Sequence, residues 1–425
     1  TPCGGGANVS KKLMAAIAVL AVMFAVFAAV PAIADDSDAT VPSAPTAIKT
    51  VGEFKEGSSA LTSDVTVTFD NKDKTLDADL TIGRAAGVTK DVTVYLKVTS
   101  KYVGDDKKTL AVMGAHTLTV KEGIILVVSE ERSGVGKEFG QNTFSGATLA
   151  INGATVYFEQ VVNGKGQFFY DGSIAMTGGK LIMHCNGMSP NTLSLNEKAE
   201  MNWESFSDKT CTQINNLPSI SVTESSTIGA GSSLTIVDGA RVQAAKGLTV
   251  EGTLNGEFHI YETEGTLTVK NGGSFDGKVF TNTTVENTTN PADSKRYVTY
   301  SSMVLEGEGS NGVTVSKTSQ NNMLITGTVQ GSSSIAKLNT DGLAYYGDIS
   351  SAEEKILAAK NFTVNEDSEF TVKKGTTLAY TDITVNAGAV LNVNGAIDGA
   401  VSGDGKIYAG PNADLSNTTY SGLKG

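Results

Sequence analysis

The stretch "ITVNAGAVL", residues 383–391, alternates apolar and polar residues, reaches a glycine and then resumes the apolar pattern. Apolar residues at its first and third positions put two side chains on one face of an extended chain and the threonine between them on the other. The glycine accepts backbone conformations that a Cβ would strain, so the chain can turn there. The nine residues therefore predict a short strand, a turn and the beginning of a second strand.

One nine-residue cassette recurs along the chain: an apolar residue, Thr, Val or Ile, two free positions, Gly, two free positions and an apolar residue. It occurs five times, as LTVKEGIIL (118–126), LTIVDGARV (234–242), LTVKNGGSF (267–275), FTVKKGTTL (370–378) and ITVNAGAVL (383–391). The Thr-centred triplet alone recurs at 65–67, 80–82, 92–94, 248–250, 313–315 and 362–364. Such recurrence predicts a repeat architecture whose units pack on their neighbours. The last residue of each cassette is expected to point into the core: Leu126, Val242, Phe275, Leu378 and Leu391.

The composition favours strands and turns over long helices. The chain has 425 residues, with 47 glycines, 7 % aromatic residues and a single tryptophan, which suits many short strands joined by tight turns. Its formal net charge is −12, and its four arginines form no basic cluster. Nucleic acid and anionic membrane surfaces are therefore not expected as partners, because both attract basic patches.

The N-terminus has the order of segments found in a secretory signal peptide. Two lysines precede an apolar run of 18 residues (13–30), and an Ala-Ile-Ala cleavage pattern follows. We expect cleavage after Ala34 and an extracellular or cell-surface protein. The alternative is an uncleaved membrane anchor helix, because a run of this length is near the minimum that spans a bilayer. Residues 1–8 do not fit a signal peptide and are interpreted as lying upstream of a true start at Val9.

The mature chain is predicted to contain a linker, a strand-rich body and a C-terminal part. Residues 35–48 are polar, contain prolines and are predicted to form a linker. Residues 49–349 are predicted to form a β-solenoid body. Within that body, 180–218 departs from the repeat and is expected to form an excursion. Residues 350–425 are expected to hold a short helix at 350–360, where SSAEEKILAAK opens with a capping box, followed by further solenoid repeats.

The export signal KKLMAAIAVLAVMFAVFAAVPAIADD, joined to phrases such as LTVEGTLNG (248–256) and LNVNGAIDG (391–399), resembles the adhesin-like secreted proteins that host-associated methanogenic archaea encode. The resemblance implies an all-β fold at the cell surface, a right-handed parallel β-helix or related β-solenoid of the pectate-lyase-like type. The cassettes start at 118, 234, 267, 370 and 383 without a constant period. This irregular spacing leaves open a mixture of solenoid and β-sandwich parts, the latter near the N-terminus.

No complete catalytic constellation is found in the sequence. NTDG (339–342) matches the first motif of polygalacturonase-type glycosidases, which use paired carboxylates, but the other motifs of that family are missing. Asp341 is therefore interpreted as a turn residue. The histidines, His116, His184 and His259, are expected to be structural. We expect no enzyme activity, no cofactor and no metal site.

A few residues are candidates for modification or binding. Cys185 and Cys211 are expected to form a disulfide after export, with two buried free thiols as the alternative. Four sequons are candidate glycan acceptors: Asn282, Asn287, Asn361 and Asn417. The Tyr345 and Tyr346 pair is the best single candidate for ligand contact, although aromatic pairs in strands more often serve packing.

Three functions are compatible with these patterns. The first is a secreted or surface-attached, non-catalytic adhesin-like or structural β-solenoid that binds extracellular glycan or protein surfaces. The second is a surface-layer or filament subunit, which requires self-association. The third is a carbohydrate-active β-helix enzyme, either a lyase or a glycosidase. Contact with a membrane is expected only through an uncleaved N-terminal segment.

Overall fold

The structure is a computed structural model, and it describes residues 40–70, 75–99, 112–130, 143–160, 169–185, 187–205, 219–285, 296–307, 309–310, 312–317, 323–329, 332–337, 355–364, 369–372, 374 and 376–423. The chain divides into two compact units, Thr1–Pro42 and Ser43–Gly425. Nearly all described residues belong to the second unit, and the fold is that of this unit.

The second unit is built mostly of strands, which confirms the predicted all-β class. Among the described residues, eighteen strands form one sheet, sheet A: β1 (Ile48–Lys49), β2 (Val65–Phe69), β4 (Val92–Val98), β6 (Ile124–Glu130), β9 (Thr155–Gln160), β12 (Lys180–His184), β13 (Gly187–Met188), β15 (Glu200–Ser205), β16 (Ser219–Val222), β18 (Ser233–Ile236), β19 (Arg241–Ala244), β21 (Thr253–Ile260), β23 (Ser274–Val285), β24 (Arg296–Glu306), β27 (Ser332–Lys337), β29 (Glu369–Val372), β31 (Val390–Val393) and β33 (Lys406–Ala409).

A second sheet, sheet B, contains fourteen strands of the described chain: β3 (Leu80–Ile82), β5 (Thr117–Lys121), β8 (Thr148–Asn152), β11 (Ser173–Thr177), β14 (Thr192–Asn196), β17 (Ser226–Ile228), β20 (Gly247–Val250), β22 (Thr266–Val269), β25 (Val313–Lys317), β26 (Met323–Val329), β28 (Lys355–Val364), β30 (Thr376–Val385), β32 (Ala396–Ser402) and β34 (Thr418–Ser421). Two short strands, β7 (Phe144–Ser145) and β10 (Phe169–Tyr170), pair with each other.

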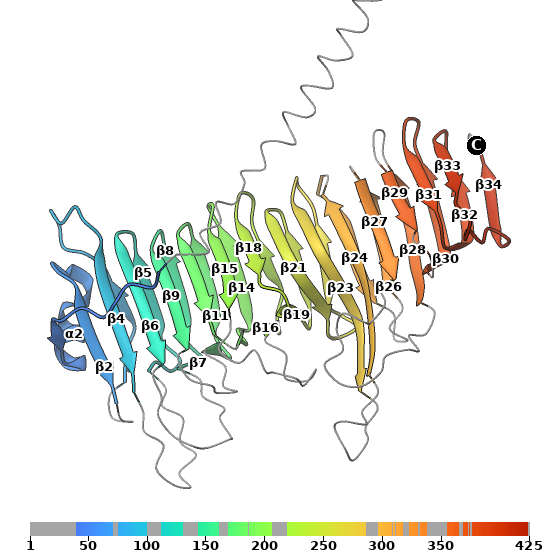
Figure 1. The fold of residues 1–425 in the computed structure, drawn as a ribbon. Helices are drawn as coiled ribbons and strands as arrows, with labels where there is room; N and C mark the ends of the chain where they lie inside the picture. The colour runs from blue at the N-terminus through green and yellow to red at the C-terminus, as the bar shows by residue number, and fades with distance from the viewer. Residues whose placement is uncertain are drawn as a thin grey trace, which may run out of the picture. The chain divides into compact units, whose positions relative to one another are not determined.

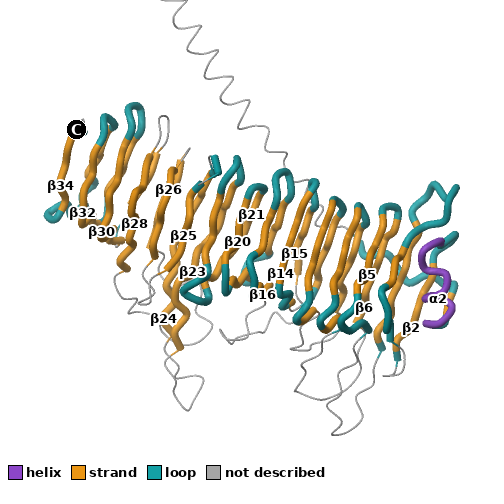
Figure 2. The backbone as a smooth tube through the Cα atoms, turned by 180° about the vertical axis from the view of Figure 1, so that it is seen from behind, coloured by secondary structure: helices purple, strands orange, loops and turns teal. Residues whose placement is uncertain are grey.

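The chain passes repeatedly from one sheet to the other, so strands that are neighbours in a sheet come from successive passes (Figures 1 and 2). Strands β2, β4, β6, β9 and β12 lie side by side in sheet A, while β3, β5, β8 and β11 lie side by side in sheet B. All strand pairs among β1–β23 are parallel. The β-sandwich alternative would require antiparallel pairs, which these strands do not make.

The direction of the chain reverses once and is then restored. Strand β24 is antiparallel to both β23 and β27, and β25 is antiparallel to both β22 and β26. From β26 and β27 onward the pairs are parallel again. One pass of the chain, through β24 and β25, thus runs opposite to its neighbours in both sheets.

The core is filled by residues that occupy the same register position in successive strands. In sheet A the row Val94, Leu126, Val156, Leu181 and Met201 is in register and fully buried. In sheet B, Leu118, Leu149, Ile174 and Leu193 form an equivalent row. The residues on either side of each row point outward, because side chains alternate along a strand.

Each cassette forms a corner between two strands, as predicted. LTVKEGIIL begins in β5 and ends in β6, and LTVKNGGSF begins in β22 and ends in β23. Four cassette glycines are left-handed, with φ between 79° and 84°: Gly123, Gly239, Gly272 and Gly388. The final residues Leu126, Val242, Phe275 and Leu391 are buried. The side chain of Leu378 lies outside the described part of the structure.

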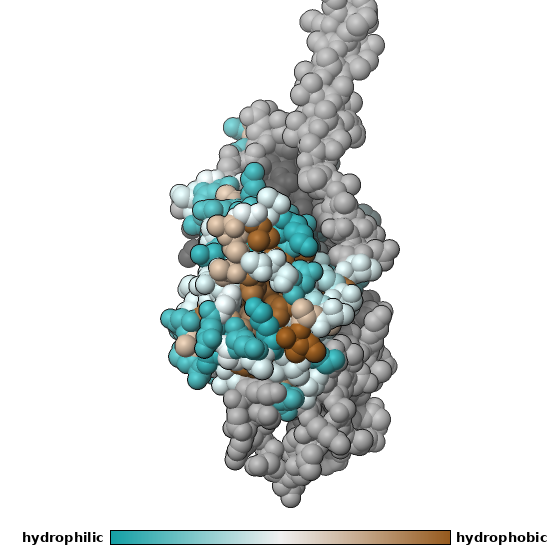
Figure 3. All heavy atoms as spheres, turned by 90° about the vertical axis from the view of Figure 1, so that its left-hand side faces the viewer, coloured by the Kyte–Doolittle hydropathy of each residue, from teal (hydrophilic) through white to brown (hydrophobic). Residues whose placement is uncertain are grey.

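A short helix lies beside the first strands of the second unit. Helix α2 (Val51–Gly57) begins after Thr50, whose side chain forms a capping box with Glu53, and it continues into a 3₁₀ turn, η1 (Ser58–Ala60). The helix buries Phe54 completely. Figure 3 views this end of the molecule and shows hydrophobic residues, in brown, among the hydrophilic ones. Ile48 in β1 is 76 % exposed here.

The structure corrects two sequence predictions. Residues 355–360 of the predicted helix at 350–360 are instead part of β28, where Leu357 is in register with Met323 and Leu378. Pairing on both sides of the strand outweighs the local helix propensity. Residues 180–205 of the predicted excursion form strands of the two sheets, β12 to β15, and residues 206–218 lie outside the described residues.

Candidate functional site

Three polar side chains of sheet A meet near the C-terminal ends of their strands. Glu159 in β9 is in register with His184 in β12. The next strand, β15, carries an irregularity: Met183 is in register with Trp203, but His184 is in register with Ser205. Glu204 is therefore the extra residue of a bulge, and bulges often redirect a side chain.

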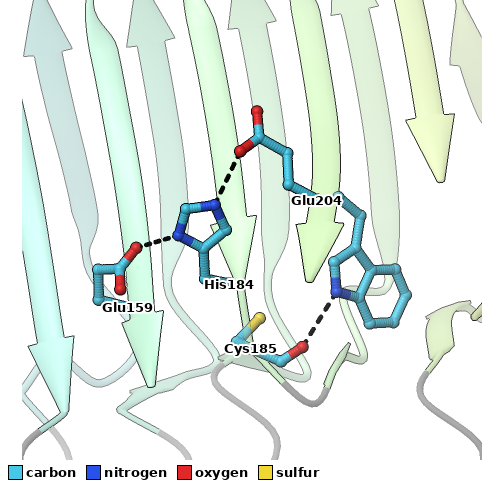
Figure 4. A network of polar contacts seen from close by, with 5 residues as sticks. Glu159, His184, Cys185 and Glu204 are labelled. Carbon is cyan, nitrogen blue, oxygen red and sulfur yellow. Dashed lines mark hydrogen bonds and ion pairs between the residues drawn. The ribbon is translucent and has the colours of Figure 1, made fainter. Parts of the chain in front are cut away.

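The imidazole of His184 lies between the two carboxylates (Figure 4). Its Nδ1 atom bonds Glu159 Oε1, and its Nε2 atom lies 2.8 Å from Glu204 Oε2. The three side chains are partly buried, with 21 %, 18 % and 24 % exposure for His184, Glu159 and Glu204. Both ring nitrogens are thus engaged by acceptors, which favours a ring that carries both protons.

The two carboxylates raise the pKa of His184 to about 9. The hydrogen bond with Glu159 is the largest cause, the bond with Glu204 adds to it, and burial opposes both. At neutral pH the imidazole of His184 is therefore protonated, and it lies between the two carboxyl groups.

The sequence neighbours of His184 and Glu204, which are Cys185 and Trp203, are buried in the core. Trp203 is buried, and its indole Nε1 donates a 3.0 Å hydrogen bond to the carbonyl oxygen of Cys185 (Figure 4). Cys185 is a free cysteine, and burial raises the pKa of its thiol to about 12. The thiol is therefore unreactive at neutral pH. Its expected disulfide partner, Cys211, lies outside the described residues.

A buried carboxyl group, that of Glu130, lies at the C-terminal ends of the neighbouring strands of sheet A. Glu130 at the end of β6 is 2 % exposed and accepts a hydrogen bond from the hydroxyl of Thr143. Gln160 at the end of β9 donates to its other oxygen at 3.3 Å. These bonds satisfy a carboxylate that would otherwise be costly to bury. The polar residues at this end thus bond mainly to each other.

A second charged cluster lies where β19, β21 and β23 pair. Arg241, Glu257 and Lys278 are in register, and Lys278 Nζ lies 3.2 Å from Glu257 Oε1. The Arg241 guanidinium lies 4.3 Å from the ring centroid of Phe280, a cation–π arrangement. His259 lies two residues after Glu257, on the same face of β21, and is 5 % exposed. Burial, aided by the charges of Arg241 and Lys317, lowers its pKa to about 3.

The outward face of sheet B is uniform and uncharged along its middle row. Side chains at one register position are small and half-buried: Thr119, Ala150, Ala175, Ser194, Thr227, Thr249, Thr268 and Thr314. The hydroxyls of Thr268 and Thr314 lie 2.9 Å apart. Successive strands repeat these groups about every 4.8 Å, so the row is a regular array of hydroxyls and methyls.

Several of the residues singled out from the sequence lie outside the described part of the structure. Tyr345, Tyr346, Cys211 and Asn287 lie outside the described residues, as does the export segment. Asn282 lies in β23 and Asn361 in β28. Asn417 is exposed just before β34. No sequence motif indicated Glu159 or Glu204, because their relation to His184 depends on strand register.

Within the described ranges, no group of three or more His, Cys, Asp or Glu residues is arranged to hold a metal ion. No described helix is long and apolar enough to cross a membrane.

Comparison with known proteins gave no match to a family model, to a curated protein or to a solved structure.

Proposed function

We propose that this chain is a non-catalytic β-solenoid of the right-handed parallel β-helix type that works outside the cell, adhering to a carbohydrate or protein surface. Parallel pairing and repeated passage between the sheets support the solenoid, since each pass then stacks on the one before it. The N-terminal signal pattern supports export. Whether that segment is removed or kept as an anchor does not alter the role of the body.

The observation that carries the proposal is the Thr, Ser and Ala row on sheet B. A flat array of hydroxyls and methyls offers hydrogen bonds and apolar contact at a constant spacing, and it contains no charge that must be desolvated. An extended, repetitive partner such as a polysaccharide matches such a regular array better than a compact small molecule does. The chemistry of the row is suited to adhesion rather than to bond cleavage.

The polar groups on sheet A support a structural rather than a catalytic role. A glycosidase needs one protonated carboxylic acid and one free carboxylate around the scissile bond. Here His184 bonds both Glu159 and Glu204. We therefore propose no enzyme activity, no cofactor and no nucleic-acid partner.

The test is binding of the purified chain to an array of polysaccharides and mucin glycans, followed by a charged substitution on each sheet. Thr249→Lys places an ammonium group in the row on sheet B, and Thr235→Lys places it at a half-buried outward position of sheet A. We expect Thr249→Lys to weaken binding at least about tenfold, an effect of about 1.4 kcal/mol, and Thr235→Lys to leave it unchanged. Equal binding by both variants would place the contact elsewhere.

A surface-layer or filament subunit, which requires self-association, is the second candidate. Such a subunit must form extended arrays. Electron microscopy of the concentrated protein separates the two functions, because an adhesin gives discrete particles and a surface-layer subunit gives a lattice or fibres.

A further inference from the structure

Polar and charged side chains gather on the outward face of sheet A where β19, β21 and β23 pair. Arg241 is in register with Glu257, and Glu257 is in register with Lys278. Two residues further along the same face, Gln243 is in register with His259. Arg241, Glu257 and His259 are 2 %, 5 % and 5 % exposed, although they face outward. Polar groups that are buried to this extent need hydrogen-bond partners.

Two atoms of β21 in this group are buried without a hydrogen-bond partner, Glu257 Oε2 and His259 Nδ1. The carboxylate of Glu257 nevertheless has opposite charges beside both oxygens, since Oε1 lies 3.2 Å from Lys278 Nζ and Oε2 lies 3.9 Å from Arg241. A buried polar atom without a partner is the mark of a bound water, an ion or a functional group. The ring nitrogen of His259 is therefore the atom that a ligand would satisfy.

The charges that act on this imidazole are positive. Burial lowers the pKa of His259, and the charges of Arg241 and Lys317 lower it further, to about 3. Lys317 ends β25, and its Nζ donates a 3.0 Å hydrogen bond to the carbonyl oxygen of Tyr261. Burial lowers the pKa of Lys317, and the charge of Glu262 opposes this shift. At neutral pH the imidazole is therefore uncharged, and with its proton on Nδ1 it can donate a hydrogen bond. Both cations favour a negatively charged acceptor at that position.

The group reaches solvent at its rim. Tyr261 is 57 % exposed, and its ring meets the imidazole of His259 edge to face, with the ring centroids 5.9 Å apart. A ligand that reaches His259 therefore enters beside this ring or in its place, and the ring offers a flat apolar surface for a sugar. Gln243 Oε1 accepts a 3.2 Å hydrogen bond from Ser221 Oγ. The NH₂ group of Gln243 is then the donor that it can offer to a ligand.

We propose that Arg241, Gln243, His259, Tyr261 and Lys317, here called the His259 site, bind the oxyanion group of a single acidic sugar unit, a carboxylate or a sulfate. The oxyanion accepts a hydrogen bond from His259 Nδ1 and is stabilised by the guanidinium and the ammonium group, which suit both kinds of oxyanion. The sugar ring packs on Tyr261. These residues are far apart in the sequence, and strand register brings them together.

The surrounding charges favour one acidic sugar unit over a long polyanion. The chain has a formal net charge of −12, and the acids Glu262 and Asp276 are exposed near the site. They repel the further anionic groups that an acidic polymer or a nucleic acid would carry. The site lies on sheet A, whereas the Thr, Ser and Ala row lies on sheet B. The inference therefore goes beyond the proposed adhesive function and does not depend on it.

The test uses the three histidines of the full chain as reporters in nuclear magnetic resonance, after isotope labelling of their ring nitrogens. Glucuronate and sulfated N-acetylglucosamine are titrated at neutral pH, and glucose and N-acetylglucosamine are the uncharged counterparts. We expect the acidic sugars to shift the ring nitrogens of His259 to saturation, with the proton on Nδ1, and to leave His116 and His184 unchanged. A response to only one acidic sugar supports the proposal and identifies the group as a carboxylate or a sulfate.

Two variants test the roles within the site. Lys317→Gln removes one cation, and we expect binding of the acidic sugar at least about tenfold weaker. Lys180→Gln is the matched control, because Lys180 lies in β12 of the same sheet with 43 % of its side chain exposed, and it should bind like the wild type. Tyr261→Ala changes an exposed residue and should weaken glucuronate more than acetate, which has no sugar ring.

Three results would overturn the proposal. The first is the lack of a saturable shift of His259 with either acidic sugar. The second is an equal shift with sodium chloride at the same ionic strength, which would show a general effect of salt. The third is equal affinity of Lys317→Gln and Lys180→Gln. Unchanged His116 and His184 signals show that each variant is folded.

Discussion

Gly256 and Gly277 lie opposite each other in neighbouring strands, and the Cβ that Gly277 lacks would lie 1.7 Å from the carbonyl oxygen of Gly256. They mark the place where two rows of strands become one. Before this point β18 and β19 are separate strands joined by a corner, whereas β21 pairs with β18 through Thr253–Asn255 and with β19 through Glu257–Ile260. Gly256, at φ 122°, is the residue between the two halves.

The first prediction concerns this junction. Gly277→Ala should destabilise the protein by about 2–4 kcal/mol, because the new methyl group would meet backbone atoms that have no room to move. Gly52→Ala is the matched control, since no atom lies within 4 Å of its Cβ position and alanine favours the helix. Urea unfolding of both variants measures the difference. A Gly277→Ala protein as stable as the wild type would mean that the two strands are not this close.

The second prediction concerns alkaline pH and His184. Because its folded pKa of about 9 lies above the ordinary histidine pKa of 6.5, the folded state holds a proton that the unfolded state releases. Its contribution to stability is fully present below about pH 6.5 and is lost as the pH rises through about 9. Urea unfolding across this range should show a decline for the wild type.

His184→Gln removes this titration and keeps a polar side chain. We expect the variant to be less stable than the wild type by about 1–2 kcal/mol near pH 6, a modest value because the three side chains are partly exposed and screened by solvent. The difference should shrink above about pH 9. A difference that stays constant across this range would show that His184 contributes through packing alone.

Local patterns in the sequence were sufficient to predict strands and corners. In the cassettes, Leu118 and Val120 are buried while Thr119 between them is half-exposed, as alternation requires. Gly123 and Gly388 adopt the left-handed conformation that the turn was expected to need. These features depend on residues within one cassette, so no knowledge of distant neighbours was necessary.

The spacing of the passes was not predictable in the same way. Leu118, Leu149, Ile174 and Leu193 are register partners, yet they lie 31, 25 and 19 residues apart. Much of the variation comes from segments of different length, such as 131–142 and 161–168, that follow β6 and β9 at the same end of sheet A. The cassettes also join different strands. The cassette at 118–126 leads from sheet B to sheet A, whereas the one at 234–242 joins two strands of sheet A, so their spacing does not give the length of a pass.

The helix prediction was wrong and the carboxylates around His184 were not foreseen, because tertiary pairing decides both outcomes. Residues 355–360 have a helical sequence but pair on both sides as β28. Thr50 and Glu53 form a real capping box, although the repeat pattern suggested strands there. Glu159 and Glu204 lie 25 and 20 residues from His184 in sequence, and only register brings them together.

The third prediction concerns acidic pH and His259. Its pKa is lowered to about 3, so the folded state keeps the imidazole neutral where the unfolded state binds a proton. This difference favours unfolding as the pH falls from about 6.5 toward 3. His259→Gln should therefore lose less stability than the wild type between about pH 6.5 and 4.5, above the range where most carboxylates titrate.

His116→Gln is the control for this measurement, because the His116 side chain is 40 % exposed. Urea midpoints at several pH values give the slope for each variant. If His259→Gln and the wild type lose stability in parallel as the pH falls, His259 is not the group that makes the fold sensitive to acid.

The last prediction concerns the helix that covers the first strands. Phe54 is fully buried, and Phe54→Ala should remove about 3–5 kcal/mol of stability from the region it covers. If each pass of the chain packs mainly on its neighbours, the loss is local. Hydrogen exchange should then accelerate in β2 and remain unchanged in β31. Thr50→Ala, which removes only the cap, should have a smaller effect in the same place, about 1 kcal/mol. Equal acceleration in β2 and β31 would instead show that the whole unit unfolds as one cooperative body, and the stacked-coil account of its stability would then be wrong.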